Sequence, residues 1–182
     1  SECDIILHSA ALTDVKNIEE CSIAACETNV VGTFNLIKAC EKYNKKLVFV
    51  STDHVFDGEK GNYKTTAAIN PLTKYAKTKA AAELITRTYE NSLIIRTSFF
   101  GHVFPYPAAF VDQWSSKDYV DLIAPKILKV SLSDRTGIVH VGSKRRSLYE
   151  IARERKNNIQ KSSRASIKFI SPIDTSLEVE NE

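Results

Sequence analysis

Methionine is absent from this sequence of 182 residues, and glycine and proline are scarce, at 6 and 5 residues. So little glycine and proline excludes a collagen-like chain and a low-complexity disordered one. No apolar run approaches the ~18 residues of a membrane-spanning helix, and no signal-peptide pattern opens the sequence. We therefore expect a globular protein with no membrane partner.

An excess of charge of one sign is also missing. Lys and Arg total 25 and Asp and Glu total 22, which leaves a net charge of +3. This balance gives no reason to expect a nucleic-acid partner. The length corresponds to about one domain, and a hydrophobic content of 43% is enough to build a sizeable core.

The cysteines form no recognisable ligand pattern. Cys3, Cys21, Cys26 and Cys40 contain no C-x-x-C pair and no His/Cys spacing suited to zinc. They are typical of reduced cysteines in a cytoplasmic protein, and we expect no metal site.

Two features suggest a longer parent sequence. An apolar strand, residues 5–7, begins almost at once, and methionine is lacking even at position 1. We expect either a fragment or a sequence from which methionine positions have been lost.

Apolar segments alternate with helical ones along the chain, which indicates an α/β domain with a mainly parallel sheet. Ser147 and Glu150 fit a capping box at one helix start. The predicted strands are residues 4–8, 47–50, 93–95 and 137–142, and the predicted helices are residues 18–42, 75–89, 117–130 and 147–155.

The most informative residues lie between positions 47 and 83. Thr52 follows a buried strand, where parallel sheets place their ligands, and Tyr75 and Lys79 are spaced to share one helix face. A nearby ammonium favours the phenolate and lowers the pKa of a tyrosine. Such a tyrosine can exchange a proton with a carbonyl or an alcohol, and Thr52 can bind the same oxygen.

A Tyr-x-x-x-Lys spacing alone is weak evidence for a catalytic pair, because surface pairs produce it by chance. The motifs around it make the catalytic interpretation the better one. Together they resemble the extended short-chain dehydrogenases/reductases, in the dTDP-4-dehydrorhamnose reductase branch that acts on nucleotide-linked sugars. The resemblance covers roughly residues 4–125 and is carried by segments 8–19, 29–36, 51–58, 70–83, 96–101 and 112–121.

The resemblance implies a Rossmann-type, doubly wound parallel sheet that binds NADP or NAD. Residues 1–100 would be the C-terminal part of the cofactor-binding domain, and residues 101–182 a small substrate-binding region with closing strands and helices. Tyr75 would be the catalytic acid, Lys79 would lower its pKa and hold the nicotinamide ribose, and Thr52 would bind the reacting oxygen. The cofactor-binding residues would be Ala10, Ala11, Ser51, Tyr75, Lys79 and Ser98, and the substrate-binding residues Asp53, His54 and Phe99.

Three departures from the family pattern stand out. The glycines form no G-x-x-G-x-x-G turn to hold a pyrophosphate, so we expect that the N-terminal βαβ units are missing. The 182 residues alone should then neither bind a dinucleotide tightly nor form a stable independent unit. Phe99 stands where the branch usually has tryptophan, and His54 where it usually has tyrosine.

The resemblance favours the reduction of a nucleotide-linked 4-keto sugar. A 4,6-dehydratase is disfavoured because Asp53-His54 replaces the Asp-Glu pair that elimination needs. Three matters stay open: an epimerase of the same fold, a non-catalytic relative such as the regulatory subunit of methionine adenosyltransferase, and a homodimer.

Some residues keep two interpretations. His54 either contacts substrate or is a loop histidine, whereas His8, at a strand end, is expected to be structural. Basic clusters at residues 144–146, 153–156 and 161–164 are typical of solvated surface, with contact to a phosphate as the alternative.

Overall fold

A computed structural model describes residues 3–166 and 171–179. Its centre is a parallel four-stranded sheet in the order β1-β2-β3-β8. The strands are β1 (Ile5–His8), β2 (Lys46–Thr52), β3 (Ser92–Thr97) and β8 (Gly137–His140). This confirms the parallel α/β sheet expected from the alternating pattern and the Rossmann-type fold that the family resemblance implied.

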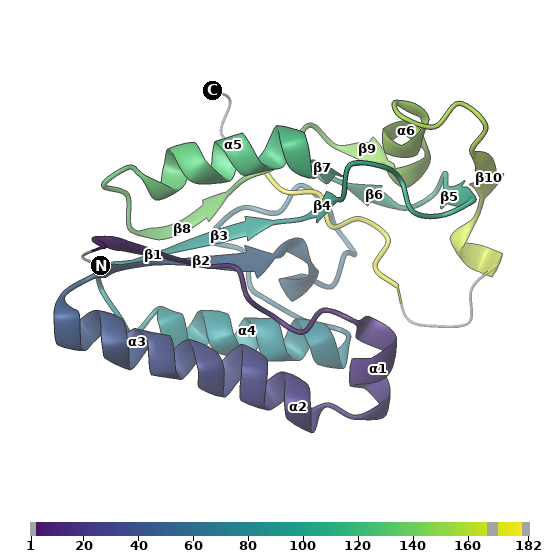
Figure 1. Ribbon diagram of the computed structural model, residues 1–182. Coiled ribbons are helices and arrows are strands. Elements are labelled where there is room, and N and C mark those ends of the chain that lie inside the picture. The colour runs from purple at the N-terminus through teal and green to yellow at the C-terminus, as the bar shows by residue number, and fades with distance from the viewer. Residues whose placement is uncertain (1–2, 167–170, 180–182) are drawn as a thin grey trace.

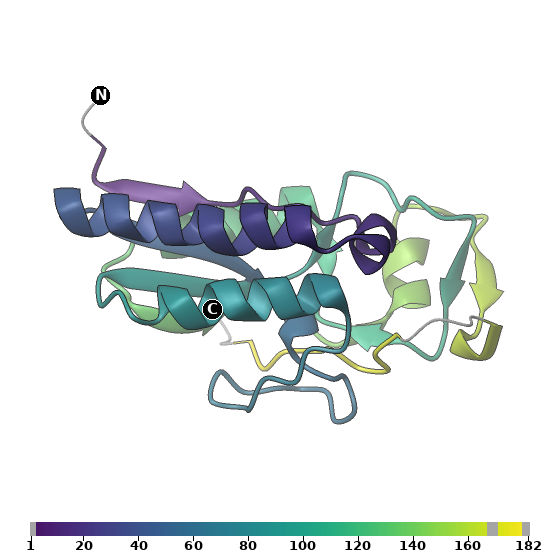
Figure 2. The same ribbon diagram turned by 90° about the horizontal axis from the view of Figure 1, so that it is seen from below.

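Helices cover both faces of this sheet. Figure 1 shows α5 (Val120–Ser131) on one face and both α3 (Gly32–Tyr43) and α4 (Lys74–Thr86) on the other. Seen from below, α3 and α4 run side by side (Figure 2). This arrangement confirms the doubly wound character of the sheet and explains why its strands are apolar on both faces.

Alternation along the strands divides the core into two parts. Val48, Leu93 and Ile95 pack with Ile123 of α5, whereas Phe49 and Ile94 pack with Ala82 of α4. Successive side chains of a strand point to opposite faces, so strands β2 and β3 each contribute to both cores.

The predicted helix over residues 18–42 is interrupted in the structure. It consists of α1 (Val15–Glu20), α2 (Ile23–Cys26), a π-helical turn η1 (Glu27–Val31) and α3. The break at Cys21–Ser22 carries no glycine or proline signal. Just before the break, α1 contacts the start of α4, where the backbone N–H of Lys74 donates to Glu19 Oε1 at 2.6 Å.

A smaller region lies beside the carboxyl ends of the central strands. The predicted helix over residues 117–130 begins later, at Val120, because residues 118–119 pair as a strand, and it runs through Pro125. Ser147 caps α6 (Leu148–Arg153) with the predicted capping box. The remaining elements are η2 (Asp53–Val55), β4 (Phe99–Phe100), β5 (Ala108–Phe110), β6 (Trp114–Ser115), β7 (Asp118–Tyr119), β9 (Arg146–Ser147), β10 (Gln160–Ser162) and η3 (Arg164–Ser166).

The division into residues 1–100 and 101–182 stays a prediction. Within the second segment, α5 and β8 return to the central sheet, where β8 pairs with β3. The short pairs β4–β7, β5–β10 and β6–β9 lie outside that sheet.

Candidate active site

The last residue of β2 brings a hydroxyl group to the carboxyl end of the sheet. Thr52 is 6% exposed, and its Oγ1 accepts a hydrogen bond from the backbone N–H of His54 at 3.2 Å. This bond caps the short helix η2, so the position of Thr52 is fixed by the turn that follows it.

Helix α4 brings a phenol to the same place. Thr73 caps the helix by accepting a bond from the backbone N–H of Ala76 at 3.2 Å, and the alanines that follow are strong helix formers. Tyr75 lies in the first turn, half-buried, and the side chain of Thr52 lies near enough to its phenol to favour the charged form. The structure thus brings Thr52 and Tyr75 together, as the sequence predicted.

Titration of Tyr75 differs from the expectation. Burial, with a smaller contribution from the Asp53 carboxylate, raises the pKa of Tyr75 to about 12. We expected a lowered pKa from Lys79, but that ammonium is turned toward the strand. At neutral pH the phenol therefore keeps its proton, which suits a group that donates one.

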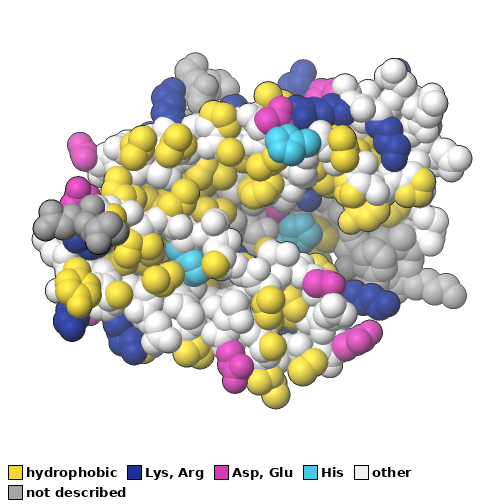
Figure 3. Space-filling view, in the orientation of Figure 1, with side chains coloured by type: hydrophobic (Ala, Val, Ile, Leu, Met, Phe, Trp, Pro, Cys, Tyr) yellow, Lys and Arg dark blue, Asp and Glu magenta, His cyan; other side chains and the backbone are white. Residues whose placement is uncertain are grey.

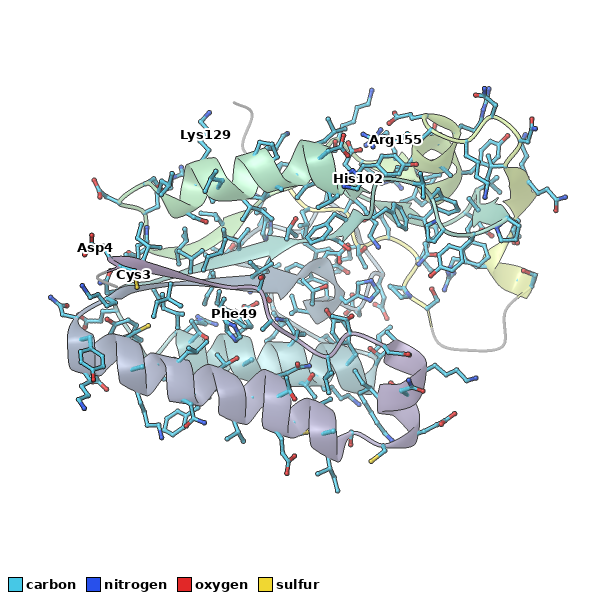
Figure 4. The ribbon with its side chains drawn as sticks, viewed as in Figure 1. Cys3, Asp4, Phe49, His102, Lys129 and Arg155 are labelled. Carbon is cyan, nitrogen blue, oxygen red and sulfur yellow. The ribbon has the colours of Figure 1, made fainter. Side chains whose placement is uncertain are left out.

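Lys79 lies one helical turn after Tyr75 and is 3% exposed. Its Nζ donates to the carbonyl oxygen of Val50 at 2.8 Å and lies 4.1 Å from the ring centroid of Phe49. Figure 4 shows Phe49 on the face of the sheet that α3 and α4 cover. Burial lowers the pKa of Lys79 to about 8, although Glu83 opposes this shift.

A buried ion pair joins α4 to β3, through Glu83, which lies one helical turn after Lys79. Arg96 Nη2 is 2.6 Å from Glu83 Oε1, with side chains 1% and 0% exposed. Ser51 Oγ donates to Glu83 Oε2 at 2.8 Å. Ser51, which was predicted to bind cofactor, therefore directs its hydroxyl to this pair.

A hydrogen-bonded chain supports the start of α4 from the η1 turn. Asn29 Nδ2 donates to Thr78 Oγ1 at 2.9 Å, and Thr78 Oγ1 donates to the carbonyl oxygen of Tyr75 at 2.8 Å. His8 Nε2 lies 2.9 Å from Thr33 Oγ1 in the same network. His8 is thus part of the supporting structure, and π-helical turns often occur at functional sites.

Asp53 is held by hydroxyl groups from distant parts of the chain. Its carboxylate accepts bonds from Ser115 Oγ at 3.1 Å and Thr175 Oγ1 at 2.8 Å, and the residue is 1% exposed. These bonds join the small region to the end of β2. Its predicted contact with substrate is untested, and the structure shows this joining role instead.

His54 and Lys117 lie beside Asp53. His54 Nε2 is 3.9 Å from Asp53 Oδ1, and burial, aided by the Lys117 charge, lowers the pKa of His54. The Nζ of Lys117 lies 4.7 Å from the ring centroid of Phe100. Sequence reasoning missed Lys117, since it belongs to no motif and its neighbours are distant in sequence.

The other predicted residues are more accessible. Ala10 is exposed and Ala11 half-buried in the loop that leaves β1, and Ser98 is half-buried between β3 and β4. Phe99 is 43% exposed. Their predicted contacts with cofactor or substrate stay predictions. Among the residues that the structure describes, no three His, Cys, Asp or Glu side chains are grouped to hold a metal ion.

Comparison with known proteins places this arrangement in a family. Residues 1–113 match the family described as the RmlD substrate binding domain. The chain belongs to the RmlD substrate binding domain family. This confirms the resemblance to the dTDP-4-dehydrorhamnose reductase branch.

Members of the RmlD family are similar to this chain in sequence and structure. A dTDP-4-dehydrorhamnose reductase of Aggregatibacter actinomycetemcomitans is 41% identical over 98 residues, 53% of this chain and 33% of the relative. A solved structure described as a hypothetical dTDP-4-dehydrorhamnose reductase of Sulfolobus tokodaii is 30% identical, with a TM-score of 0.85 over 96% of this chain and 71% of that one. The corresponding enzyme of Bacillus anthracis, in complex with NADP, is 26% identical, with a TM-score of 0.83 over 96% and 70%.

The chain spans about a third of the length of the first curated relatives it matches. Within that part, the RmlD family match covers the strand end that carries Thr52 and the helix that carries Tyr75 and Lys79.

Proposed function

We propose that this protein is an NAD(P)-dependent oxidoreductase that reduces the keto group of a nucleotide-linked sugar, of the dTDP-4-dehydrorhamnose type. The observation that carries the proposal is that Thr52 and Tyr75 come together at the carboxyl end of a parallel strand, with Lys79 one turn further along α4. The RmlD relatives support the choice of substrate class.

The side chains divide the work of the reaction. Tyr75 is protonated at neutral pH and gives its proton to the oxygen of the reduced carbonyl. Thr52 holds that oxygen in place. Lys79 uses one of its donors on Val50, so its other N–H groups can bind the ribose hydroxyls beside the nicotinamide. When bound, the cofactor supplies the hydride.

The donors present fit the nicotinamide end of the cofactor, since Lys79 and Tyr75 offer an ammonium and a phenol on one helix face. Glycines of this sequence form no G-x-x-G-x-x-G turn for the pyrophosphate. Cofactor binding, a homodimer and a cytoplasmic location belong to the proposal. The free cysteines among the described residues support a reducing compartment.

The decisive test replaces the proton donor. In the full-length protein, we expect Tyr75→Phe to lower the rate of NADPH oxidation with dTDP-4-dehydrorhamnose by ~10²–10⁴-fold, because a positioned acid is lost. NADPH affinity should change little, since phenylalanine keeps the packing. Tyr43→Phe, on an exposed tyrosine of α3, is the matched control and should retain the parent rate.

Two outcomes would contradict the proposal. If Tyr75→Phe reduces the substrate at the parent rate, Tyr75 is not the acid. If the parent protein binds NADPH but turns over no nucleotide-linked keto sugar, a non-catalytic role is favoured instead.

A further inference from the structure

A second concave surface lies away from the candidate active site. It is a cavity of about 660 Å³ bounded by the second half of α5, the strand β8 and the segment that leads into β9. Helix α5 covers the face of the sheet opposite α4, as Figure 1 shows. Tyr75 and Lys79 therefore lie on the other side of the sheet from this cavity.

The rim of the cavity is cationic. Among the residues that the structure describes, none in its lining is an aspartate or a glutamate, and five are Lys or Arg: Lys126, Lys129, Arg135, Lys144 and Arg146. Figure 4 shows Lys129 extending from α5 on the side away from α3. Grouped positive charge along one rim favours an anionic ligand.

Two of these cations, Lys126 and Lys144, have ammonium groups whose charge can attract a ligand. The Nζ of Lys126 donates to the neutral carbonyl oxygen of Gly142 at 3.2 Å. Lys144 is exposed, and its charge lowers the pKa of Glu150 by electrostatic attraction. Within residues 3–166 and 171–179, neither ammonium is paired with a carboxylate. Arg146 differs, because Asp118 holds its guanidinium at 2.6 Å.

The floor of the cavity is apolar. Val139 and Val141 belong to the core under α5, and Val130 packs against them. Val179 also lines the cavity. A flat apolar group can lie on these valines while an attached anion reaches the lysines. The wall is closely packed at Gly142, where a Cβ would lie 2.8 Å from the backbone oxygen of Ser116.

We propose that this cavity binds a nucleoside phosphate, with the base on the valine floor and the phosphates at Lys126 and Lys144. The proposal gives a role to the basic cluster 144–146, which the candidate active site does not use. It stands apart from the proposed function, because no residue of the cavity belongs to that site.

The test is a titration of the isotope-labelled protein with ADP, followed by NMR. We expect chemical-shift changes at the amides of Val141, Gly142 and Ser143. Adenosine alone and pyrophosphate alone should each bind at least ~10-fold more weakly, because each uses half of the site.

Charge removal supplies the matched comparison. The double variant Lys126→Gln/Lys144→Gln should weaken ADP binding by ~10-fold or more, since it removes two charge-assisted contacts. Lys38→Gln/Lys42→Gln removes two exposed charges from α3 and should leave binding unchanged. Spectra of both variants elsewhere in the chain report whether the fold is intact.

Several outcomes would overturn the proposal. Absent shifts at these three amides, or shifts confined to residues 52–54 and Tyr75, would show that ADP does not use this cavity. Equal affinity for pyrophosphate and ADP would show a simple anion site without a base-binding floor. Equal weakening in both double variants would show only a general charge effect.

Discussion

The pKa values of Tyr75 and Lys79 differ widely, and this difference sets the pH dependence of the proposed reaction. Tyr75 has a pKa of about 12 and stays protonated over the working range. Lys79 has a pKa lowered to about 8, so it loses its charge as the pH rises through that value. Because Lys79 is assigned to the ribose of the cofactor, we expect the reduction rate at subsaturating NADPH to fall above about pH 8, by roughly tenfold for each further pH unit.

Lys79→Arg provides the control for that pH profile. A guanidinium stays charged at every pH at which proteins are assayed, so the residual activity of this variant should show no decline near pH 8. A parent profile that is flat from about pH 7 to about pH 10 would contradict the assignment of Lys79.

Helix α4 is fixed to the sheet by the Glu83–Arg96 pair, and this is testable as a property of the element. Arg96 also donates to the carbonyl oxygen of Thr65 at 3.0 Å, so the pair joins α4, β3 and the loop before the helix. Glu83→Gln leaves a buried guanidinium without its counter-charge. We expect it to reduce the free energy of unfolding by ~3–5 kcal/mol in urea denaturation.

Two comparisons make that measurement specific. Glu90→Gln removes an exposed carboxylate and should change the free energy of unfolding by less than ~0.5 kcal/mol. The double variant Glu83→Leu/Arg96→Leu should cost less than Glu83→Gln alone, because it leaves no unpaired buried charge. A double variant that is the less stable of the two would contradict this explanation.

Local sequence patterns were sufficient to predict most elements of the central sheet. They were insufficient where contacts between distant residues determine where a helix begins or ends. The strands of the sheet follow from short apolar runs, and the capping box located α6. The break after α1 lies beside a contact between Glu19 and Lys74 of α4, and the late start of α5 follows from the pairing of β7 with β4. Neither contact leaves a signal in its own segment.

The candidate active site also depends on contacts across the whole molecule that local sequence patterns do not predict. The spacing of Tyr75 and Lys79 and the strand before Thr52 predicted that these residues meet. The hydrogen bond from Thr175 to Asp53 joins residues 122 positions apart, and no local pattern indicates it. The predicted direction of the Tyr75 pKa was wrong for a related reason, since burial raises that pKa and the Asp53 carboxylate adds to the rise.

At the scale of the whole molecule, the outer edge of β1 is the surface that we expect to pair with another chain. Within the described part of the chain, β1 pairs only with β2, and Leu7 is 44% exposed. Figure 3 shows hydrophobic side chains gathered between α5 and α3, around this edge. An open, apolar strand edge is a template for pairing with another chain.

We therefore expect concentration-dependent association of the 182-residue chain, measured by sedimentation velocity, and expect Leu7→Lys to reduce it. A charge on an edge strand opposes strand addition because its burial is costly. Leu128→Lys, at an exposed leucine of α5 that is 55% accessible, is the control and should leave the association unchanged. If Leu128→Lys reduces the association as much as Leu7→Lys does, net charge rather than the β1 edge controls it.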